Sequence, residues 1–294
     1  MKLLALKNWL ARTARTLSPY LIWCLVGAIS VFIGVLAIFA FQGDEEEETS
    51  SYEEPASLEG CNVLGLNIHG CILTYAPTAD EGMSGVPEGC DAMTVSENII
   101  ASLDEASKNK DIKAILLDID SGGGMPQAAV EIEDALKASG KPSVAWIRAY
   151  GNSAAYWIAS AADTVIASKE SDVGSIGVTM SYVDYAKQNE KDGLTYNSIS
   201  TGKYKDIGNS DKPLTQDERA MLERSNRITL TNFIETIAEN RSLSIDTVRS
   251  LADGSSWLGA EALSLGLIDK LGTYPEVMAH MKELLKKDPV VCWQ

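Results

Sequence analysis

The longest apolar stretch of the chain runs from Tyr20 to Phe41 and contains no charged residue over its 22 positions. A helix rises about 1.5 Å per residue, so this stretch is long enough to cross the roughly 30 Å hydrocarbon core of a bilayer. A cleavable signal peptide is the alternative, but its apolar region is usually about 7–15 residues long and ends at small residues. This stretch instead ends in Phe41-Gln42, and the pattern predicts an uncleaved transmembrane helix at 20–41.

Charge on the two sides of this segment predicts its orientation. An acidic run at 44–48 follows it, and four basic residues precede it: Lys2, Lys7, Arg12 and Arg15. The positive-inside rule places the basic end in the cytoplasm. We therefore expect a single-pass protein of the cell membrane, and we expect its domain at 61–294 to lie outside the cytoplasm. The other parts are a cytoplasmic N-terminus at 1–19, the membrane helix at 20–41 and an acidic stalk at 42–60.

Beyond the stalk, the pattern alternates between the periods of strands and helices. An apolar run at 63–73 is followed by a segment with glycine and proline, 76–91, which predicts a loop. Strands are expected at 112–119, 143–147 and 164–167, and helices at 95–107, 127–138, 154–162, 215–240, 245–252, 259–265 and 275–286. The longest helix opens with the capping-box spacing Thr215-x-x-Glu218. Strands separated by helices predict βαβ units, a mostly parallel sheet and the α/β class.

Composition narrows the classes of ligand. The 41 acidic residues exceed the 25 basic ones, and a surface with a net charge of −16 repels the phosphates of nucleic acid. Four cysteines beyond the membrane segment allow either free thiols or two disulfides in three possible connectivities: Cys61, Cys71, Cys90 and Cys292. No two cysteines have CxxC spacing and the chain has two histidines, so we expect neither a metal site nor a cofactor.

Three glycines follow the predicted strand 112–119, in the segment Asp120-Ser121-Gly122-Gly123-Gly124. Glycine permits sharp bends and exposes backbone N–H groups that can face a phosphate or an oxyanion. The segment has neither of the glycine spacings of nucleotide-binding loops, and Asp118-x-Asp120 lacks the later ligands of a calcium loop. An ordinary tight turn is the alternative to an anion-binding one.

A run of small residues at 151–162 leads from the predicted strand 143–147 into the next helix and carries Ser153. A serine at such a junction can present its hydroxyl beside unpaired backbone N–H groups, although serine is also a common helix N-cap. A nucleophilic serine needs a base. His69 and His280 accompany no glycine-rich turn and look structural. A lysine can replace histidine where burial favours its neutral amine. By composition Lys205 is one of many lysines, and a solvated lysine is the alternative.

Together these segments resemble the signal peptide peptidase A (SppA) family over about Val63 to Leu271. The family's Ser-Pro-Gly-Gly corresponds to 121–124, and its nucleophile segment corresponds to 152–159. Its later elements correspond to Gly-Ser-Ile-Gly-Val at 174–178, Thr-Gly-Lys-Tyr-Lys-Asp at 201–206, Asp-Gly at 253–254 and Gly-Leu-Ile-Asp at 266–269. The departures are Gly122 in place of proline and Ala154-Ala155 in place of a Gly-Gly pair.

This resemblance implies a Clp-protease-like or crotonase-like fold and a serine endopeptidase with a Ser/Lys dyad. Ser153 falls on the nucleophile, Lys205 on the general base, and Ser175 on the hydroxyl that hydrogen-bonds the lysine. The expected oxyanion donors are the backbone N–H groups of Gly123 and Ala154. Residual signal peptides and other membrane-associated polypeptides are the expected substrates.

The resemblance also implies a homo-oligomer. Short members of the family assemble as rings in which adjacent subunits contribute the serine and the lysine of one active site, so we expect a ring, with an octamer as the expected size. Two other functions stay open: a related membrane Clp-class protease with a particular membrane-protein substrate, and an inactive ring that binds hydrophobic peptides. An acyl-CoA hydratase or isomerase of the same fold has less support, because the sequence has no clear adenine-nucleotide signature.

Overall fold

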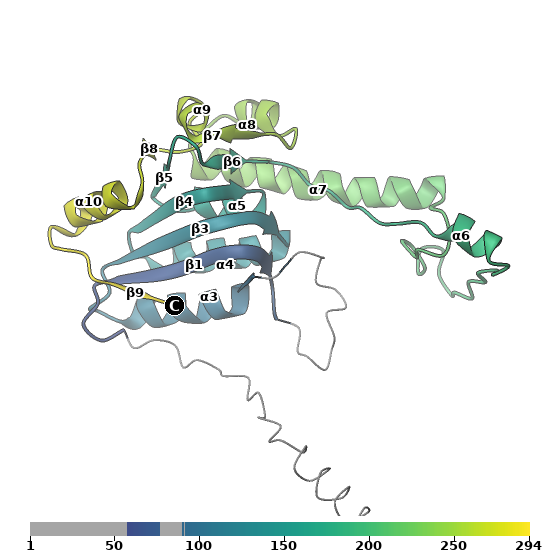
Figure 1. Cartoon of the computed structure of the whole chain (residues 1–294), viewed down its shortest axis with the longest axis horizontal. Coiled ribbons are helices and arrows are strands. Elements are labelled where there is room, and N and C mark those ends of the chain that lie inside the picture. The colour runs from purple at the N-terminus through teal and green to yellow at the C-terminus, as the bar shows by residue number, and fades with distance from the viewer. Residues whose placement is uncertain (1–57, 77–89, 91) are drawn as a thin grey trace, which may run out of the picture. The chain divides into compact units, whose positions relative to one another are not determined.

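The computed structural model describes residues 58–76, 90 and 92–294 (Figure 1). The predicted transmembrane segment 20–41, most of the predicted stalk and most of the predicted loop 76–91 lie outside the described residues. Within the described ranges, no helix combines the length and the apolar character needed to cross a membrane. The described part of the chain is a mixed α/β structure built on one mostly parallel sheet, which confirms the predicted class.

Nine strands of the described residues form this sheet. Its main path has the order β2-β1-β3-β4-β5-β8, while β9 pairs with β1, and β6 pairs with β4 and β7. The β6–β7 pair is antiparallel and the other pairs are parallel. The strands are β1 (Val63–Leu73), β2 (Met93–Val95), β3 (Ala114–Gly124), β4 (Ser143–Asn152), β5 (Thr164–Ala167), β6 (Asp172–Gly174), β7 (Ser256–Leu258), β8 (Lys270–Leu271) and β9 (Val291–Trp293).

Seven of the eight helices of the described residues lie where the apolar periodicity predicts them, within one or two residues at most ends. They are α3 (Ser96–Lys108), α4 (Pro126–Ser139), α5 (Ala154–Ser160), α6 (Ala186–Lys191), α7 (Gln216–Asn240), α8 (Ile245–Leu251), α9 (Gly259–Ser264) and α10 (Tyr274–Leu285). The predicted capping box of α7 is present, since Thr215 Oγ1 accepts the N–H of Glu218 and the Glu218 carboxylate accepts the N–H of Thr215. Helix α6 and the strands of two or three residues were not predicted, because such short elements leave no periodic pattern.

Apolar side chains alternate between the two faces of the sheet, and each face has its own helical cover. On one face, Leu117 and its strand neighbours pack with buried residues of α3, α4, α5 and α7. On the other face, Leu116 packs with Val277 and Met281 of α10. Because β3 is buried on both faces from Ala114 to Ile119, its sequence reads as a continuous apolar run rather than an alternating one.

The glycine segment that follows this run is not a turn, so the expectation of a loop at 120–124 was wrong. β3 continues to Gly124, and Cys71 and Ile72 of β1 pair with Gly123 and Gly124. The strands approach so closely there that a Cβ on Gly124 would lie 2.1 Å from the carbonyl oxygen of Ile72. The glycines therefore allow β3 to continue beyond the register shifts in its pairing with β1 and with β4. Strand β4 likewise continues to Asn152.

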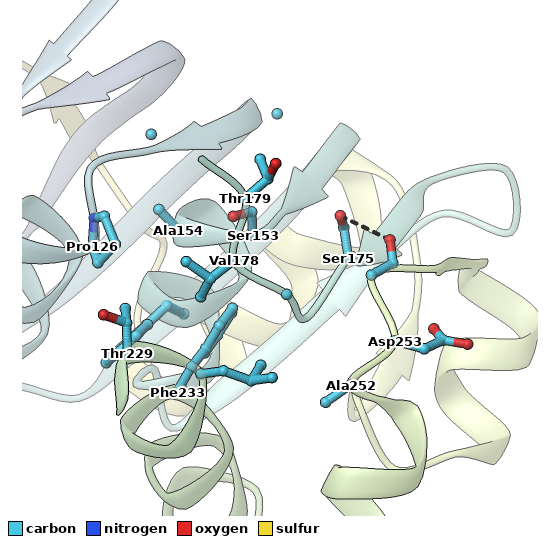
Figure 2. Close-up of a pocket in the computed structure, with 16 residues that line it drawn as sticks. Pro126, Ser153, Ala154, Ser175, Val178, Thr179, Thr229, Phe233, Ala252 and Asp253 are labelled. Carbon is cyan, nitrogen blue, oxygen red and sulfur yellow. Dashed lines mark hydrogen bonds between the residues drawn. The ribbon is translucent and has the colours of Figure 1, made fainter. Parts of the chain in front are cut away.

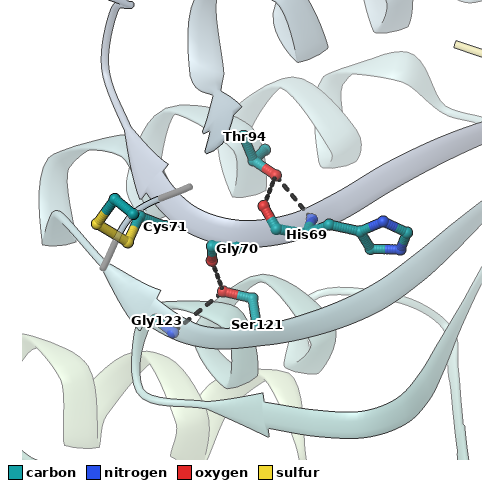
Figure 3. The surroundings of a disulfide bond; sticks show 7 residues. His69, Gly70, Cys71, Thr94, Ser121 and Gly123 are labelled. Carbon is teal, nitrogen blue, oxygen red and sulfur yellow. Dashed lines mark hydrogen bonds between the residues drawn. A yellow bond between two sulfur atoms is a disulfide. The ribbon is translucent and has the colours of Figure 1, made fainter. Parts of the chain in front are cut away.

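Two disulfides resolve the connectivity that the sequence left open. Cys61 is bonded to Cys292, with 5.8 Å between their Cα atoms, and this bond joins the start of β1 to the parallel strand β9. Cys71 is bonded to Cys90, with a Cα–Cα distance of 5.5 Å (Figure 3). The second bond lies on the stretch of β1 that pairs with the glycines of β3.

Candidate active site

The carboxyl ends of β3, β4 and β6 meet at one edge of the sheet, and the segment that carries Ser153 begins there. Gly151 pairs with Ser121 of β3 and with Val173 of β6. A cavity of about 570 Å³ opens at this edge (Figure 2). Its lining includes three of the predicted site residues: Ser153, Ala154 and Ser175. The carboxyl ends of parallel strands are a frequent place for ligand sites in α/β proteins.

Ser153 stands at the junction of β4 and α5 in a backbone conformation that few residues with side chains adopt. Its φ is 54° and its ψ is −123°, and its N–H donates to the carbonyl oxygen of Gly174 at 2.8 Å. Residues held in such sparsely populated conformations cluster at functional sites. The ordinary role of a helix N-cap serine does not apply, because the Ser153 side chain makes no capping hydrogen bond to α5. Its hydroxyl is thus available on the wall of the cavity.

Gly123 lies directly against Ser153. Its φ is +116°, and a Cβ at this position would lie 2.7 Å from Cβ of Ser153 and 3.2 Å from the backbone nitrogen of Ala154. In this structure the N–H of Gly123 donates to Oγ of Ser121 at 3.0 Å, and Ser121 Oγ donates to the carbonyl oxygen of Gly70 at 2.6 Å (Figure 3). Of the two expected oxyanion donors, the Gly123 N–H is therefore engaged by Ser121, which holds β3 to β1.

The two departures from the family pattern fit the local structure. Gly122 has open space where a Cβ would be, so the backbone does not require a glycine there. Ala154 and Ala155 are both buried, and their methyl groups belong to the main apolar core. The methyl group of Ala155 is thus packed inside the protein, whereas Ala154 is buried and also lines the cavity.

Ser175 lies on the opposite wall of the cavity from α7. Its N–H donates to the carbonyl oxygen of Ser255 at 2.9 Å, and its hydroxyl donates to that of Gly254 at 3.2 Å (Figure 2). The N–H of Gly254 in turn donates to the carbonyl oxygen of Ile176 at 3.1 Å. These bonds join two motifs that lie about 80 residues apart in the sequence, 174–178 and 253–254, so both take part in forming the cavity.

The apolar floor and walls of the cavity come largely from residues that the sequence did not single out. Trp157 of α5 stacks on Phe233 of α7, with ring centroids 4.6 Å apart and an angle of 15° between the planes. The other apolar contributors are Pro126, Ala154, Val178, Leu230 and Ala252. The spacing of residues 229, 230 and 233 along α7 places their side chains on one face of that helix. This spacing was the available sequence signal for the α7 side of the cavity, but nothing in the sequence indicated that α5 packs against this face.

Lys205 does not line this cavity. It lies exposed in the connection between β6 and α7, where its N–H donates to the carbonyl oxygen of Gly202. This connection is held to the first turn of α7, because Lys203 pairs with Asp217 and Lys212 pairs with Glu218. Asp217 and the cavity residue Thr229 are twelve positions apart, about 18 Å along the helix. Within one chain, the segment that carries Lys205 is therefore attached to the start of α7, whereas the Ser153 cavity is lined by residues further along this helix.

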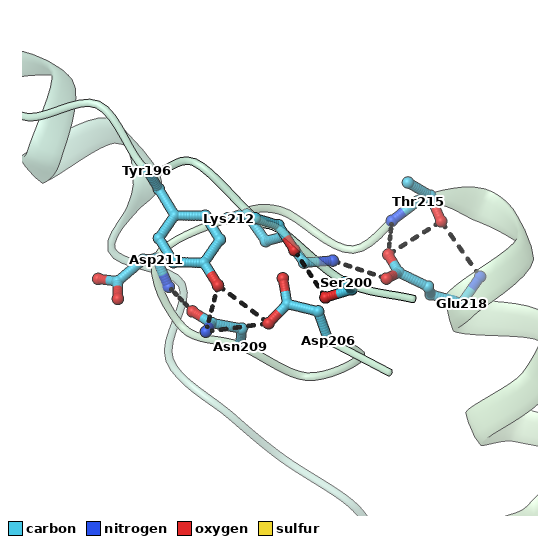
Figure 4. A network of polar contacts seen from close by, with 9 residues as sticks. Tyr196, Ser200, Asp206, Asn209, Asp211, Lys212, Thr215 and Glu218 are labelled. Atoms are coloured by element: carbon cyan, nitrogen blue, oxygen red, sulfur yellow. Dashed lines mark hydrogen bonds and ion pairs between the residues drawn. The ribbon is translucent and has the colours of Figure 1, made fainter. Parts of the chain in front are cut away.

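A polar network gives the connection around Lys205 a defined form (Figure 4). Tyr196 donates its hydroxyl hydrogen to the carboxylate of Asp206 at 2.9 Å, and the Asn209 side-chain amide donates to the Tyr196 oxygen at 2.9 Å. Lys212 Nζ lies 2.6 Å from the Glu218 carboxylate. Asp206, which follows Lys205 in the sequence, is thus held by Tyr196, and Tyr196 is held by Asn209.

The two histidines lie away from the cavity, as expected. His69 Nε2 is 3.4 Å from the Asp118 carboxylate on the sheet. His280 Nδ1 is 2.9 Å from Lys270 Nζ, and burial together with this neighbouring cation lowers the pKa of His280. Neither ring contributes to the cavity wall at Ser153.

Comparisons with known proteins identify the family of this chain. Residues 135–288, more than half of the chain, match the family model described as peptidase family S49. The chain is 34% identical over 184 residues to the "Putative protease MJ0651" of Methanocaldococcus jannaschii, which covers 62% of this chain and 59% of that protein. It is 26% identical over 246 residues to the "Putative signal peptide peptidase SppA" of Enterococcus faecium, covering 83% of this chain and 69% of the relative.

A plant protein is also similar. The chain is 32% identical over 192 residues to the chloroplastic serine protease SPPA of Arabidopsis thaliana, covering 64% of this chain and 28% of the relative. The matches thus span between about a quarter and two thirds of the relatives' own lengths. The family match itself includes Ser153, Ser175 and Lys205. The chain belongs to peptidase family S49.

Proposed function

We propose that this chain is a membrane-anchored serine endopeptidase that uses Ser153 as its nucleophile and Lys205 as its general base. The observation that carries the proposal is the conformation of Ser153. Its hydroxyl makes no capping hydrogen bond, lies on the wall of the cavity, and is adjacent to Gly123 at the end of β3. Membership of a peptidase family agrees with this chemistry. The parallel sheet and its helical cover fit a Clp-protease-like fold.

The proposed reaction begins when the neutral amine of Lys205 takes the proton of Ser153 Oγ as that oxygen attacks the peptide carbonyl. The N–H of Ala154 and, once released from Ser121, the N–H of Gly123 stabilise the oxyanion of the tetrahedral intermediate. Lys205 then gives the proton to the leaving amine, and an acyl-enzyme forms on Ser153. In deacylation, Lys205 takes a proton from the water that attacks the acyl carbonyl, the ester bond to Ser153 Oγ breaks, and Lys205 returns the proton to that oxygen, while Ser175 orients the amine.

This reaction needs Lys205 from a second copy of the chain. Two observations support a homo-oligomer: Lys205 lies away from the Ser153 cavity of its own chain, and its connection exposes many large apolar side chains. They are Met180, Tyr182, Val183, Tyr185, Leu194 and Ile199, of which Ile199 is 99% exposed. Exposed apolar surface of this extent marks an interaction site. The proposed assembly is a ring in which each connection reaches the cavity of its neighbour, with an octamer as the expected size.

The proposed location is the outer side of the cell membrane, with residues 20–41 as the anchor. The two disulfides support it, since such bonds persist in oxidising compartments and are rare in the cytosol. The proposed substrates are residual signal peptides and other membrane-associated polypeptides. An extended apolar peptide would place a side chain such as Leu or Ala in the cavity formed by Trp157 and Phe233.

A covalent probe directed at serine tests the proposal on the full-length protein in detergent micelles. A fluorophosphonate should label the wild-type protein at Ser153, and a peptide with Leu before the scissile bond should be hydrolysed. The Ser153→Ala protein should show neither reaction. Binding of apolar peptides with neither labelling nor hydrolysis would instead support the inactive peptide-binding ring.

A further inference from the structure

A buried carboxylate lies behind the cavity, where α4, α5 and α7 meet. Glu133 of α4 is 5% exposed. One of its oxygens accepts the indole N–H of Trp157 at 2.5 Å. The other accepts from Lys137 Nζ at 2.7 Å and from the Asn240 amide at 2.9 Å. Asn240 also donates to Ser160 Oγ at 3.0 Å, so the network joins all three helices.

Stability alone does not account for this arrangement. Burying a carboxylate is costly even when it is paired, and an apolar replacement of similar volume is often neutral or stabilising. The compensating cation, Lys137, is itself 44% exposed at its side chain, which weakens its attraction for Glu133. What the carboxylate provides, and an apolar side chain would not, is a directional acceptor for the Trp157 N–H.

The orientation of that indole ring matters for the cavity. One edge of Trp157 bonds to Glu133, while its face stacks on Phe233, and both aromatic residues line the cavity. Asn240 lies seven residues after Phe233, on the same face of α7, so Glu133 fixes this helix beside the stacked pair as well. A change in the tilt of the indole would alter the shape of the apolar wall next to Ser153.

We propose that Glu133 is a positioning residue that sets the side-chain selectivity of the Ser153 cavity by holding the Trp157 indole against Phe233. The inference rests on the proposed peptidase function. Glu133 touches neither the nucleophile nor a reacting atom, and it acts through the indole. Its loss therefore changes which side chains the cavity prefers more than it changes the chemistry at Ser153.

Two peptides that differ only in the residue before the scissile bond, Leu in one and Ala in the other, provide the test. The readout is the ratio of their kcat/KM values on the full-length enzyme, since this ratio does not depend on the amount of active protein. Glu133→Leu should lower the Leu/Ala ratio by about tenfold, mainly through KM for the Leu peptide, because pocket shape governs discrimination of this size. Glu133→Gln keeps one acceptor oxygen for the indole, while its NH2 group replaces the oxygen that accepts from Lys137 and Asn240, so it should lower the ratio less than Glu133→Leu does.

Trp157→Phe keeps a ring on Phe233 but removes the N–H, so it should lower the ratio as Glu133→Leu does. The double variant should be no worse than either single one, because the two changes remove the same interaction. If Glu133→Leu does not fold, Trp157→Phe and Glu133→Gln carry the comparison. Ser143→Ala is the matched control, because it removes a buried hydroxyl bonded to Asp163 at the opposite end of β4.

An unchanged ratio in a folded Glu133→Leu or Trp157→Phe protein would overturn the inference, and so would an equal shift in the Ser143→Ala control. Either result would leave the proposed function standing, since Ser153 would still be labelled and both peptides cleaved. A wild-type enzyme that cleaves neither peptide and resists the serine probe would remove the proposed function itself.

Discussion

A Cβ on Gly123 would lie 2.7 Å from Cβ of Ser153, so the end of β3 approaches the start of α5 more closely than a side chain at position 123 would permit. This contact brings a strand with potential oxyanion donors against the proposed nucleophile. It also explains why the chain carries glycine at 123, where φ is +116°. The close approach fixes the geometry of the site and leads to the first prediction.

Gly123→Ala should fold but lose most of its activity. The new methyl group must displace Ser153 or the strand, which moves the N–H groups of residues 123 and 154 away from the developing oxyanion. We expect kcat to fall by about 10²-fold or more, the size of effect seen when one oxyanion donor is lost. Peptide hydrolysis and the rate of fluorophosphonate labelling measure it.

Gly122→Ala is the control for this variant, because a Cβ at 122 meets no atom within 4 Å. Because Gly122 also lines the cavity, the comparison is the rate of fluorophosphonate labelling at Ser153, which should stay within about twofold of wild type. Equal losses in the two variants would show that the close contact at Gly123 is not what matters.

The two disulfides should differ in what they support. Cys61–Cys292 closes a separation of 231 residues far from Ser153, and replacing both cysteines by alanine should lower the free energy of unfolding by about 2–5 kcal/mol. Activity at low temperature should persist. Replacing Cys71 and Cys90 should also reduce kcat, because Cys71 pairs with Gly123 beside the proposed nucleophile, Ser153. Denaturant unfolding and peptide hydrolysis separate the two effects, and unaltered kcat in the second variant would contradict this role.

Acid should weaken the attachment of the Lys205 connection to α7. The Lys212 ammonium, followed by the backbone and hydroxyl of Thr215, lowers the pKa of Glu218 from 4.5 to about 2. A depressed folded-state pKa means that the contribution to stability is complete above about pH 4.5 and is lost as the pH falls towards 2. The urea midpoint of wild type should therefore fall more between pH 5 and pH 3 than that of Glu218→Gln.

Glu223→Gln, on the exposed part of the same helix, is the control for the loss of one carboxylate. It should keep the wild-type dependence on pH over this range. If Glu218→Gln and wild type lose stability in parallel, the contact with Lys212 and Thr215 does not link protonation to folding.

Much of this fold could be predicted from local pattern, because the main strands and helices are long enough to show their period. The Thr215 capping box and the continuous apolar run of β3 are examples. The glycines of 122–124 misled the prediction, since glycine signals a turn unless a neighbouring strand accommodates it. Here, β1 pairs with Gly123 and Gly124 and keeps them in the sheet.

The site was predictable only where the chemistry is carried by a motif. Ser153 and Ser175 were identified from their segments, and both line the cavity. Trp157 and Phe233 were not, because they lie 76 positions apart and meet only when α5 packs on α7. The role of Glu133 depends on a third helix and left no local signal.

The last prediction concerns the separation of Ser153 from Lys205 within one chain. Ser153→Ala and Lys205→Ala should each lower peptide hydrolysis by about 10³-fold or more, and the double variant should be scarcely worse, because groups that act as one unit are non-additive. Hydrolysis rates on the three full-length proteins measure these losses.

Mixing the two single variants before assembly tests whether neighbouring chains share a site. A mixed ring would contain some interfaces at which an intact Ser153 cavity meets an intact Lys205 connection, so partial activity should return, in proportion to such interfaces. Mixing after assembly should restore none, and mixing either variant with the double variant should also restore none, because no interface then has both groups. Absence of recovery in co-assembled rings would place both residues in one chain's site and require the connection between β6 and α7 to fold back. Near-normal hydrolysis by pure Lys205→Ala would instead remove Lys205 from the mechanism.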